Sequence, residues 1–398
     1  MRILVHDHSG HPFQAELSRE LARRGHTVTH SYVAGYVSGK GRLQAEPGET
    51  ITFEGIGGDK PIENMRMLDR LKREIVRGFE LVRHVRRVDP DITMLSNVQI
   101  PTLVIFAVAA MFLRRPWVLW HQDVYAVAVR SFTGTKLPKR FAVVAAAFEV
   151  AERFCARRAR AIVVIAPSFL PVHEKWGTAG KATVIPNWAP LDEIFPVERK
   201  NDWAAEHELD DVPTLLYSGT LGLKHNPVLL VRLARKVLDL GQQVRLVVVN
   251  TGPAAEVIAE EAARLDVPVT LLPFQPYERL PEVLGTGDVL VVLLDKQAGA
   301  FSVPSKTLSY LCAGRPVLGM LPAENLAADL IVRAGGRVVA PEDEELDAAA
   351  VWAAGVLADR ERQTRVGQSS RALAEQEFAL PRCADQFEAL LGRSVNCG

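Results

Sequence analysis

Cysteine and long hydrophobic runs are both scarce in this sequence. Among 398 residues there are four cysteines, too widely scattered for metal-ligand spacing: Cys155, Cys312, Cys383 and Cys397. The longest apolar run, residues 100–113, contains Pro101 and has 14 residues, whereas crossing a bilayer needs about 20. We therefore expect a buried helix there rather than a membrane span. Without a recognisable signal peptide, the chain is expected to be cytoplasmic, with reduced thiols.

A net charge is also lacking, since 47 Lys and Arg balance 47 Asp and Glu. The balance hides an asymmetry: residues 1–185 carry 27 basic and 17 acidic side chains, a net charge of +10, and residues 186–398 carry −10. A basic half favours contact with an anionic surface. Internal repeats and low-complexity segments are absent too, and we expect no nucleic-acid partner.

The length and the patterning of the chain predict two α/β domains. A chain of 398 residues is too long for one ordinary core, and its 48% hydrophobic content is typical of globular proteins. Residues 1–33 read as strand, helix and strand, and residues 214–294 repeat this alternation. Such alternation is typical of open parallel sheets.

One stretch, AFSVPSKTLSYLCAGRPVL at residues 300–318, predicts an anion site. The apolar run 289–295 before it reads as a strand, and a short helical pattern follows Pro304. Ser305 is expected to cap this helix, and Lys306 adds a positive charge in its first turn. Free amides and the helix dipole attract anions, so this helix start is predicted to bind a diphosphate.

A second loop, in TLLYSGTLGLKHN at residues 214–226, follows another strand. Gly219 and Gly222 permit close backbone approach to a ligand, and Lys224 supplies a charge. Two glycines are weak evidence alone, but the loop and the P-S-K stretch about 80 residues later predict a phosphate site together.

These strings carry a family resemblance. PSKTLSYLCAGRPVLG resembles the P-S-K-x-x-E-Y-x-A-x-G-x-P-V signature of glycosyltransferase family 4, and YSGTLGLK resembles its Y-x-G-x-x-G-x-x-K loop. RRPWVLWHQD at residues 114–123 resembles its P-x-V-x-x-x-H-D stretch, and V-I-P-N at 184–187 resembles its crossing into the second domain. The resemblance is strongest over residues 115–320, and looks closest to colanic-acid and other bacterial surface-polysaccharide transferases.

The resemblance implies a GT-B fold, in which two Rossmann-like domains present parallel sheets to a central cleft. Residues 1–186 would form the acceptor-binding domain and residues 187–378 the donor-binding domain. The last helix, about 379–398, would cross back onto the first domain. The implied reaction is retaining transfer of a sugar from a UDP- or GDP-linked donor to a sugar or lipid-linked sugar acceptor, in surface polysaccharide or glycolipid assembly. No metal or other cofactor is implied.

The resemblance also implies site residues. The catalytic set would be His121, beside the donor sugar, and Lys224 and Lys306, on the diphosphate. The donor-binding set would be Gly219, Thr220, Gly222, Phe274, Gln275, Ser302, Pro304, Ser305 and Ser309. Gly10 and Asp123 would line the acceptor or sugar pocket. Two positions depart from the family pattern: Ser309 replaces the acidic residue that usually binds the ribose, and Phe301 replaces a companion glutamate.

Several of these assignments have structural alternatives. Gly10 equally fits a turn that needs glycine, and Phe274 equally fits a core position in an ordinary loop. Asp89-Pro90-Asp91 resembles a metal-binding Asp-x-Asp motif, but it follows a helical pattern and precedes a strand, so we interpret it as a turn.

The basic segment 136–160 has apolar residues at helical spacing and basic residues at both ends. It fits a helix on a membrane surface, which would place the protein peripherally on the inner membrane face. It equally fits a helix packed on its own sheet with a solvated basic rim.

Two other functions remain open. The loss of acidic residues at 301 and 309 is compatible with a non-catalytic nucleotide-sugar-binding protein. A sugar-nucleotide epimerase would use the same fold, but that chemistry needs acid and base groups at the sugar carbon, and no carboxylate pair is placed to supply them.

Overall fold

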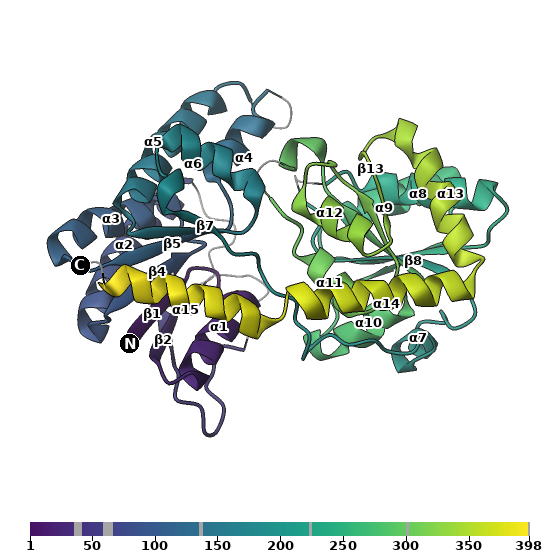
Figure 1. Cartoon of the computed structure of the whole chain (residues 1–398). Coiled ribbons are helices and arrows are strands. Elements are labelled where there is room, and N and C mark those ends of the chain that lie inside the picture. Colours follow the sequence, from purple (N-terminus) through teal and green to yellow (C-terminus); the bar gives the residue numbers. More distant parts are fainter. Residues whose placement is uncertain (36–41, 59–66, 135–137, 223–224, 300–301, 397–398) are drawn as a thin grey trace. The chain divides into compact units, whose positions relative to one another are not determined.

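The computed structural model of the chain describes residues 1–35, 42–58, 67–134, 138–222, 225–299 and 302–396. The chain divides into two compact units, whose helices and strands are labelled in Figure 1. The N-terminal unit comprises Met1–Asn187 with Leu380–Gly398, and the C-terminal unit comprises Trp188–Ala379. Each boundary lies one residue from the position expected from the sequence.

The N-terminal unit is built on a seven-stranded parallel sheet in the order β3-β2-β1-β4-β5-β6-β7. Its central strands are buried on both faces, which explains why they read as continuous apolar runs. The strands are β1 (Arg2–Asp7), β2 (Thr27–Val33), β3 (Thr52–Ile56), β4 (Ile92–Ser96), β5 (Trp117–His121), β6 (Ala161–Val164) and β7 (Ala182–Val184).

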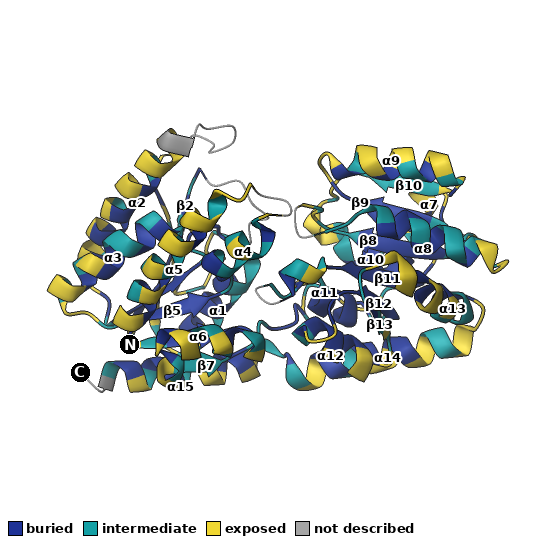
Figure 2. Cartoon of the chain, turned by 90° about the horizontal axis from the view of Figure 1, so that it is seen from above, coloured by how far each residue is buried: buried dark blue, intermediate teal, exposed yellow. Residues whose placement is uncertain are grey.

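Helices cover both faces of this sheet. Figure 2 shows α2, α3 and α5 on one face and α1 and α15 on the other. The helices are α1 (Pro12–Arg23), α2 (Met67–Val88), α3 (Ile100–Leu113), α4 (Tyr125–Phe132), α5 (Phe141–Arg158), α6 (Leu170–Trp176) and α15 (Leu380–Asn396). Short 3-10 turns occur at Pro167–Phe169 and Ala179–Lys181.

The last helix, α15, packs into the N-terminal unit although 192 residues separate it from the rest of that unit. Its Phe387 is fully buried and lies against Trp120 of β5, with ring centroids 4.7 Å apart. Arg24, after α1, forms ion pairs with Asp385 and Glu388 of the same helix. Apolar contact and charge pairing therefore both hold α15 in place.

The helix at Ile100–Leu113 has the predicted bounds, but it is not wholly buried. Phe106 and Ala107 face the core, whereas 79% of Phe112 and 43% of Met111 are exposed. The helix is apolar on every side because its sequence has almost no polar residue, and only one side has protein to pack against. The expectation of a buried helix is therefore wrong for its outer face. In the part of the chain that the structure describes, no helix is long and apolar enough to cross a membrane.

The C-terminal unit contains a six-stranded parallel sheet in the order β10-β9-β8-β11-β12-β13. Its strands are β8 (Thr214–Ser218), β9 (Arg245–Val249), β10 (Val269–Leu272), β11 (Val289–Leu293), β12 (Val317–Met320) and β13 (Arg337–Val339). Leu215, Leu233, Val248, Val291 and Leu318 belong to its buried core.

The helices of the C-terminal unit connect successive strands and then close the unit after β13. They are α7 (Asp202–Glu206), α8 (Val228–Asp239), α9 (Ala254–Leu265), α10 (Leu280–Thr286), α11 (Lys306–Cys312), α12 (Leu326–Arg333), α13 (Leu346–Leu357) and α14 (Arg360–Glu377). Short 3-10 turns occur at Tyr277–Arg279, Lys296–Ala298 and Asp343–Glu345.

Both sheets reverse their strand order once. In the first sheet β1 lies beside β4, and in the second β8 lies beside β11, with connections leading away to opposite sides. In open α/β sheets, ligands bind beyond the carboxyl ends of the strands at such a reversal. Each unit therefore has one place where a site is expected.

Candidate functional site

In the C-terminal unit, the two predicted phosphate loops follow the two strands at the reversal. The glycine loop begins at Gly219, directly after β8, and α11 begins at Lys306, after β11 and a short 3-10 turn. β8 and β11 are hydrogen-bonded neighbours, so the two loops meet at the carboxyl edge of the sheet. This one strand pairing brings together two loops that lie about 80 residues apart in the sequence.

Lys306 lies against the glycine loop. Its ammonium group contacts the hydroxyl of Tyr217 and lies 3.7 Å from the centre of the Tyr217 ring. A Cβ atom at Gly219 would lie 2.9 Å from Nζ of Lys306, and the φ of Gly219 is +141°. Both the space and the backbone conformation at position 219 therefore require glycine.

The environment of Lys306 disfavours its charge. Burial of the ammonium group lowers the pKa of Lys306 to about 7. Burial alone causes this shift, and no carboxylate among the described residues offsets it. A buried ammonium without a nearby carboxylate favours the binding of an anion. The negative charge of the anion stabilises the protonated lysine and raises its pKa.

Two tyrosines fix this arrangement. The hydroxyl of Tyr310, on α11, donates to the carbonyl of Ser218 at 3.1 Å and accepts from the Ser218 amide at 2.9 Å. The hydroxyl of Tyr217 donates to the carbonyl of Thr220 at 2.9 Å. Burial raises the pKa of both phenols, so both remain neutral near pH 7. Sequence reasoning missed their role, although both tyrosines stand inside the two quoted motifs.

Asn250, after β9, supports the glycine loop from the other side. Its Nδ2 donates to the carbonyl of Gly219 at 2.9 Å, and the Gly219 amide donates to the carbonyl of Val249 at 3.0 Å. Gly222 donates its amide to Nδ1 of His225 at 3.1 Å. The loop is thus held on three sides. Lys224, predicted to share the diphosphate, and Phe301 lie outside the described residues.

The P-S-K stretch differs from the prediction at one residue. Ser305 occupies the N-cap position of α11, but its hydroxyl makes no capping hydrogen bond. Its backbone is already helical, with φ −57° and ψ −29°, whereas a capping serine needs an extended backbone to reach the amides of the first turn. The expected cap is therefore wrong. Pro304 is buried, Ser305 is exposed, and Ser302 and Ser309 are half-buried, with Ser309 one turn after Lys306.

The loop predicted to hold the nucleotide base follows β10, two strands away from β8, or roughly 10 Å at ordinary strand spacing. Phe274 is 46% exposed, so the alternative that it fills the core is wrong. The Phe274 amide donates to Oγ1 of Thr251 at 3.1 Å. Gln275 accepts from Nε1 of Trp203 at 3.1 Å and donates to the carbonyl of Pro273, which fixes its side chain.

In the N-terminal unit, the loop after β1 forms the second candidate site. Gly10 is buried with φ +75°, so the turn itself requires glycine. Asp7, at the end of β1, is buried and accepts from Nδ2 of Asn97, after β4, at 2.7 Å and from the His11 amide. Burial raises the pKa of Asp7. Asp7 and Asn97 were missed in the sequence, where an acidic residue ending the first strand was the available signal.

His121 lies at the end of β5, as expected, but its side chain is 6% exposed. Its Nδ1 lies 3.2 Å from Nε2 of His173, and its Nε2 lies 3.6 Å from Glu152. The carboxylate of Glu152 accepts from the first two amides of α4, those of Tyr125 and Ala126. Burial, and then the charge of His121, lower the pKa of His173 to about 3. His121 is therefore part of a buried polar network.

The residues that follow His121 connect β5 to the domain boundary. Gln122 and Asn187 exchange two amide hydrogen bonds, of 3.0 and 3.1 Å. No local pattern predicts a pairing of these two positions, which are 65 residues apart. Asp123, half-buried, follows at the start of the loop to α4.

Asp89-Pro90-Asp91 forms the predicted turn between α2 and β4. Arg2 contacts Asp89 at 3.3 Å and Asp91 at 3.1 Å, and Arg115 also pairs with Asp89. The turn lies at the amino end of β4, opposite the edge where ligands are expected. Among the described residues there is no group of three or more His, Cys, Asp or Glu that could hold a metal ion.

Comparisons with known proteins give one family match and several similar folds. The model of the family described as Glycosyltransferase Family 4 matches residues 13–193. The match covers less than half of the chain. It begins within α1, after β1 and Gly10, and includes His121 and the V-I-P-N crossing. A search of curated proteins gave no significant match for this chain.

Solved structures share the fold of this chain. Sucrose-phosphate synthase from Thermosynechococcus elongatus has a TM-score of 0.74 and 15% identity over 100% of both chains. HepE from Anabaena, solved with UDP-glucose, has a TM-score of 0.73 and 16% identity over 99% of this chain and 100% of its own. WaaG, involved in lipopolysaccharide biosynthesis, has a TM-score of 0.68 and 15% identity, with coverages of 96% and 98%. The fold is that of GT-B glycosyltransferases, as predicted.

Proposed function

We propose that this glycosyltransferase is retaining and metal-independent, and that it transfers a sugar from a UDP- or GDP-linked donor. Lys306 carries the proposal: its buried ammonium, with no carboxylate acting on it in the part of the chain that the structure describes, lies at the sheet reversal against a loop that requires glycine. A donor diphosphate would supply the missing negative charge. HepE, which shares the fold, binds UDP-glucose, and this likeness supports the choice of donor class.

In the proposed reaction, the acceptor oxygen forms a bond to the anomeric carbon on the face from which the diphosphate departs. The carbon–oxygen bond to the diphosphate breaks, and the departing phosphate oxygen takes the acceptor proton. Lys306 and the amides of the glycine loop stabilise the charge that develops on the leaving group. Lys224 is predicted to share this role, and Phe274 to stack on the base. His121 is predicted to orient the donor sugar.

The Asp7–Gly10 loop of the N-terminal unit is the proposed acceptor site. Asp7 has a pKa raised by burial, and it lies at the reversal of the first sheet. We propose a sugar or a lipid-linked sugar as the acceptor. Because the N-terminal half carries a net charge of +10, we also propose reversible binding to an anionic membrane surface, weakened by salt, with a screening length of about 8 Å at physiological ionic strength.

The test begins with calorimetric binding of UDP-glucose and GDP-mannose to the purified chain. Lys306→Ala should weaken binding of the preferred donor roughly ten- to hundredfold, since a charge-assisted hydrogen bond contributes about 1.5–3 kcal/mol. Unchanged affinity would contradict the phosphate assignment. Free nucleotide released only when an acceptor is consumed would show transfer. Binding without release would favour a binding protein, and release of an altered sugar nucleotide without acceptor would favour an epimerase.

A further inference from the structure

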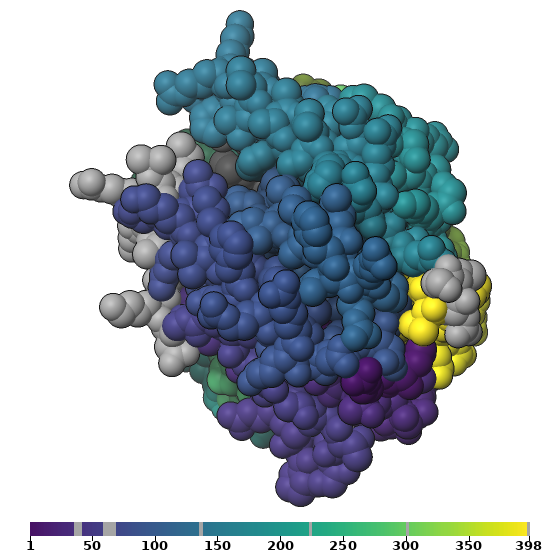
Figure 3. All heavy atoms as spheres, turned by 90° about the vertical axis from the view of Figure 1, so that its left-hand side faces the viewer, coloured from purple at the N-terminus to yellow at the C-terminus, as the bar shows by residue number. Residues whose placement is uncertain are grey.

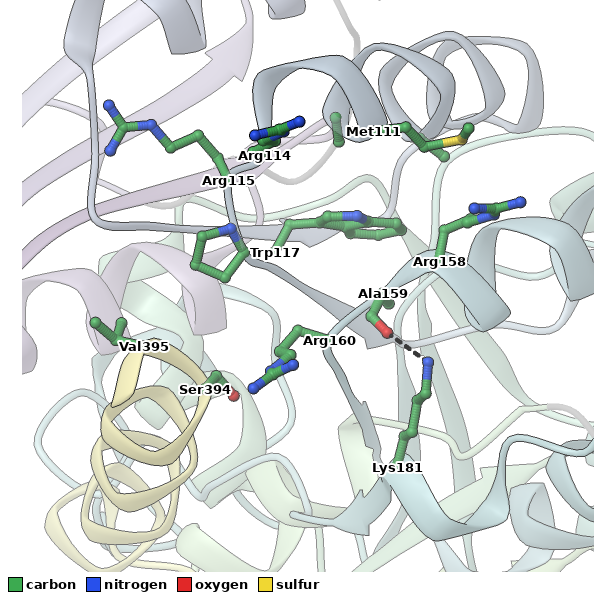
Figure 4. Close-up of a pocket in the computed structure, with 13 residues that line it drawn as sticks. Met111, Arg114, Arg115, Trp117, Arg158, Ala159, Arg160, Lys181, Ser394 and Val395 are labelled. Atoms are coloured by element: carbon green, nitrogen blue, oxygen red, sulfur yellow. Dashed lines mark hydrogen bonds between the residues drawn. The ribbon is translucent and has the colours of Figure 1, made fainter. Parts of the chain in front are cut away.

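A basic cavity of about 590 Å³ lies at the amino ends of the strands in the N-terminal unit, at the edge of the sheet opposite the Asp7–Gly10 loop. The end of α3 and the start of β5 form one side of it, the segment between α5 and β6 another, and the end of α15 a third. Figure 4 shows Arg160 pointing toward Ser394 of α15 and Lys181 lying below the main chain at Ala159.

Five cationic side chains line the cavity: Arg114, Arg115, Arg158, Arg160 and Lys181. None of the lining residues that the structure describes is an aspartate or glutamate. Arg115 is paired with Asp89 and points away from the others in Figure 4. Lys181 donates to the main-chain carbonyls of Arg157 and Ala159, at 2.8 and 3.0 Å. Two main-chain carbonyl dipoles therefore stabilise the ammonium of Lys181, which lies among other cationic side chains.

The crowding has an electrostatic cost. The pKa of Lys181 is lowered first by burial and then by the charges of Arg160 and Arg158. Cations that lower one another's pKa gain from an anion placed among them. Helix dipoles explain part of the clustering, because Arg114 and Arg158 stand at helix C-termini. Dipoles at helix ends do not explain Lys181, which lies in a 3-10 turn.

Exposed apolar side chains lie beside the cavity. Val108, Met111 and Phe112 are exposed on one face of α3, and Met111 itself lines the cavity. Figure 3 looks onto this face of the N-terminal unit, where α2 and α3 (blue) form the surface. The neighbouring helices α2 and α5 add further exposed apolar residues: Leu71, Ile75, Val76, Phe79, Val143, Val144 and Val150. A surface that combines apolar and cationic side chains matches the boundary between lipid headgroups and acyl chains.

We propose that the cavity binds the phosphate of an anionic phospholipid headgroup, with the outer face of α3 inserted among the neighbouring acyl chains. The inference rests on the proposed membrane binding and gives it one specific site instead of a diffuse basic surface. It does not depend on the donor site, which belongs to the other unit.

The experiment is sedimentation of the full chain with vesicles of phosphatidylcholine alone and with added phosphatidylglycerol. Arg158→Gln with Arg160→Gln removes two exposed cavity charges. Lys139→Gln with Arg140→Gln removes the same charge at the other end of α5, roughly 27 Å away for 18 residues of helix. At about tenfold per 1.4 kcal/mol and about 1 kcal/mol per charge, the cavity pair should lose roughly thirtyfold in affinity for anionic vesicles. The control pair should stay within about twofold.

Phe112→Ser should also weaken vesicle binding several-fold, whereas Val351→Ser, at an exposed position of the C-terminal unit, should not. Equal losses of vesicle affinity in the Arg158/Arg160 variant and in the Lys139/Arg140 variant would overturn the specific site and leave diffuse membrane binding intact. No preference of the wild type for anionic vesicles would overturn both. Binding of millimolar glycerol 3-phosphate that depends on Arg158 and Arg160 but does not reduce sedimentation with anionic vesicles would show a soluble phosphate as the ligand and overturn the lipid. UDP-glucose binding, measured on the same variants, keeps these results separate from donor recognition.

Discussion

Replacing Lys306 with methionine should abolish a proton uptake that accompanies donor binding. With a pKa of about 7, Lys306 is roughly 10% protonated at pH 8 and roughly 90% protonated at pH 6 in the free protein. A bound diphosphate places negative charge beside the ammonium and raises its pKa back toward the ordinary value. Binding of UDP-glucose should therefore take up about 0.9 proton at pH 8 and about 0.1 at pH 6.

The affinity for the donor should depend on pH. The protonated form binds the donor, and the free protein loses that form as the pH rises through 7. Donor affinity should thus be highest below pH 7 and fall by up to about tenfold per pH unit above it. A nucleotide sugar suits this test because its esterified diphosphate does not titrate in this range. Tyr217 and Tyr310, whose pKa values are raised by burial, also stay neutral throughout.

The measurement is calorimetry of UDP-glucose binding at pH 8 in Tris and in HEPES, whose ionisation enthalpies differ. The difference in observed heat gives the number of protons taken up. Lys306→Met should bind more weakly and show no buffer dependence, whereas Lys306→Arg, which stays charged, should bind with little pH dependence. Identical heats in both buffers for the wild type would refute the neutral lysine. Uptake that persists in Lys306→Met would assign the proton to another group and contradict the role of Lys306.

Gly219→Ala should weaken donor binding at least tenfold, because the new Cβ would lie 2.9 Å from Nζ of Lys306 at a φ of +141°; Gly241→Ala, also at a positive φ (+81°) but outside the glycine loop and with nothing within 4 Å of the new Cβ, is the matched control, and equal affinities of the two variants would contradict this account. Activity should survive excess EDTA and the double substitution Asp89→Asn with Asp91→Asn, provided that melting curves show a folded protein; loss with EDTA and recovery with manganese would overturn metal independence. Phe387→Ala should destabilise the N-terminal unit by about 3–5 kcal/mol in urea unfolding, because it empties a fully buried site against Trp120; an unchanged midpoint would show that α15 adds little to that core.

Local patterns predicted the elements of the donor site, but not its contacts. The strand before Gly219 and the helix after Pro304 were readable because apolar runs and helical spacing are local properties. The contact between Lys306 and Tyr217 depends on β8 pairing with β11, which no local pattern specifies. The reciprocal hydrogen bonds of Gln122 and Asn187 were missed for the same reason.

Two errors have a similar origin. Ser305 is a residue type that favours helix N-caps, but its helical backbone keeps the hydroxyl away from the amides that a cap must reach. Ile100–Leu113 is apolar on all sides, and composition alone does not tell which side meets protein. The exposure of the face with Phe112 depends on how the neighbouring elements pack against α3.

The position of α15 has a consequence for synthesis. The C-terminal unit is one continuous segment, Trp188–Ala379, whereas the N-terminal unit is completed by Leu380–Gly398. At about 5–20 residues per second, a ribosome needs roughly 10–40 s to make the intervening segment. During that interval Trp120 of β5 lacks its contact with Phe387, while the C-terminal unit can already fold. Synthesis of the N-terminal unit therefore begins before that of the C-terminal unit and is completed after it.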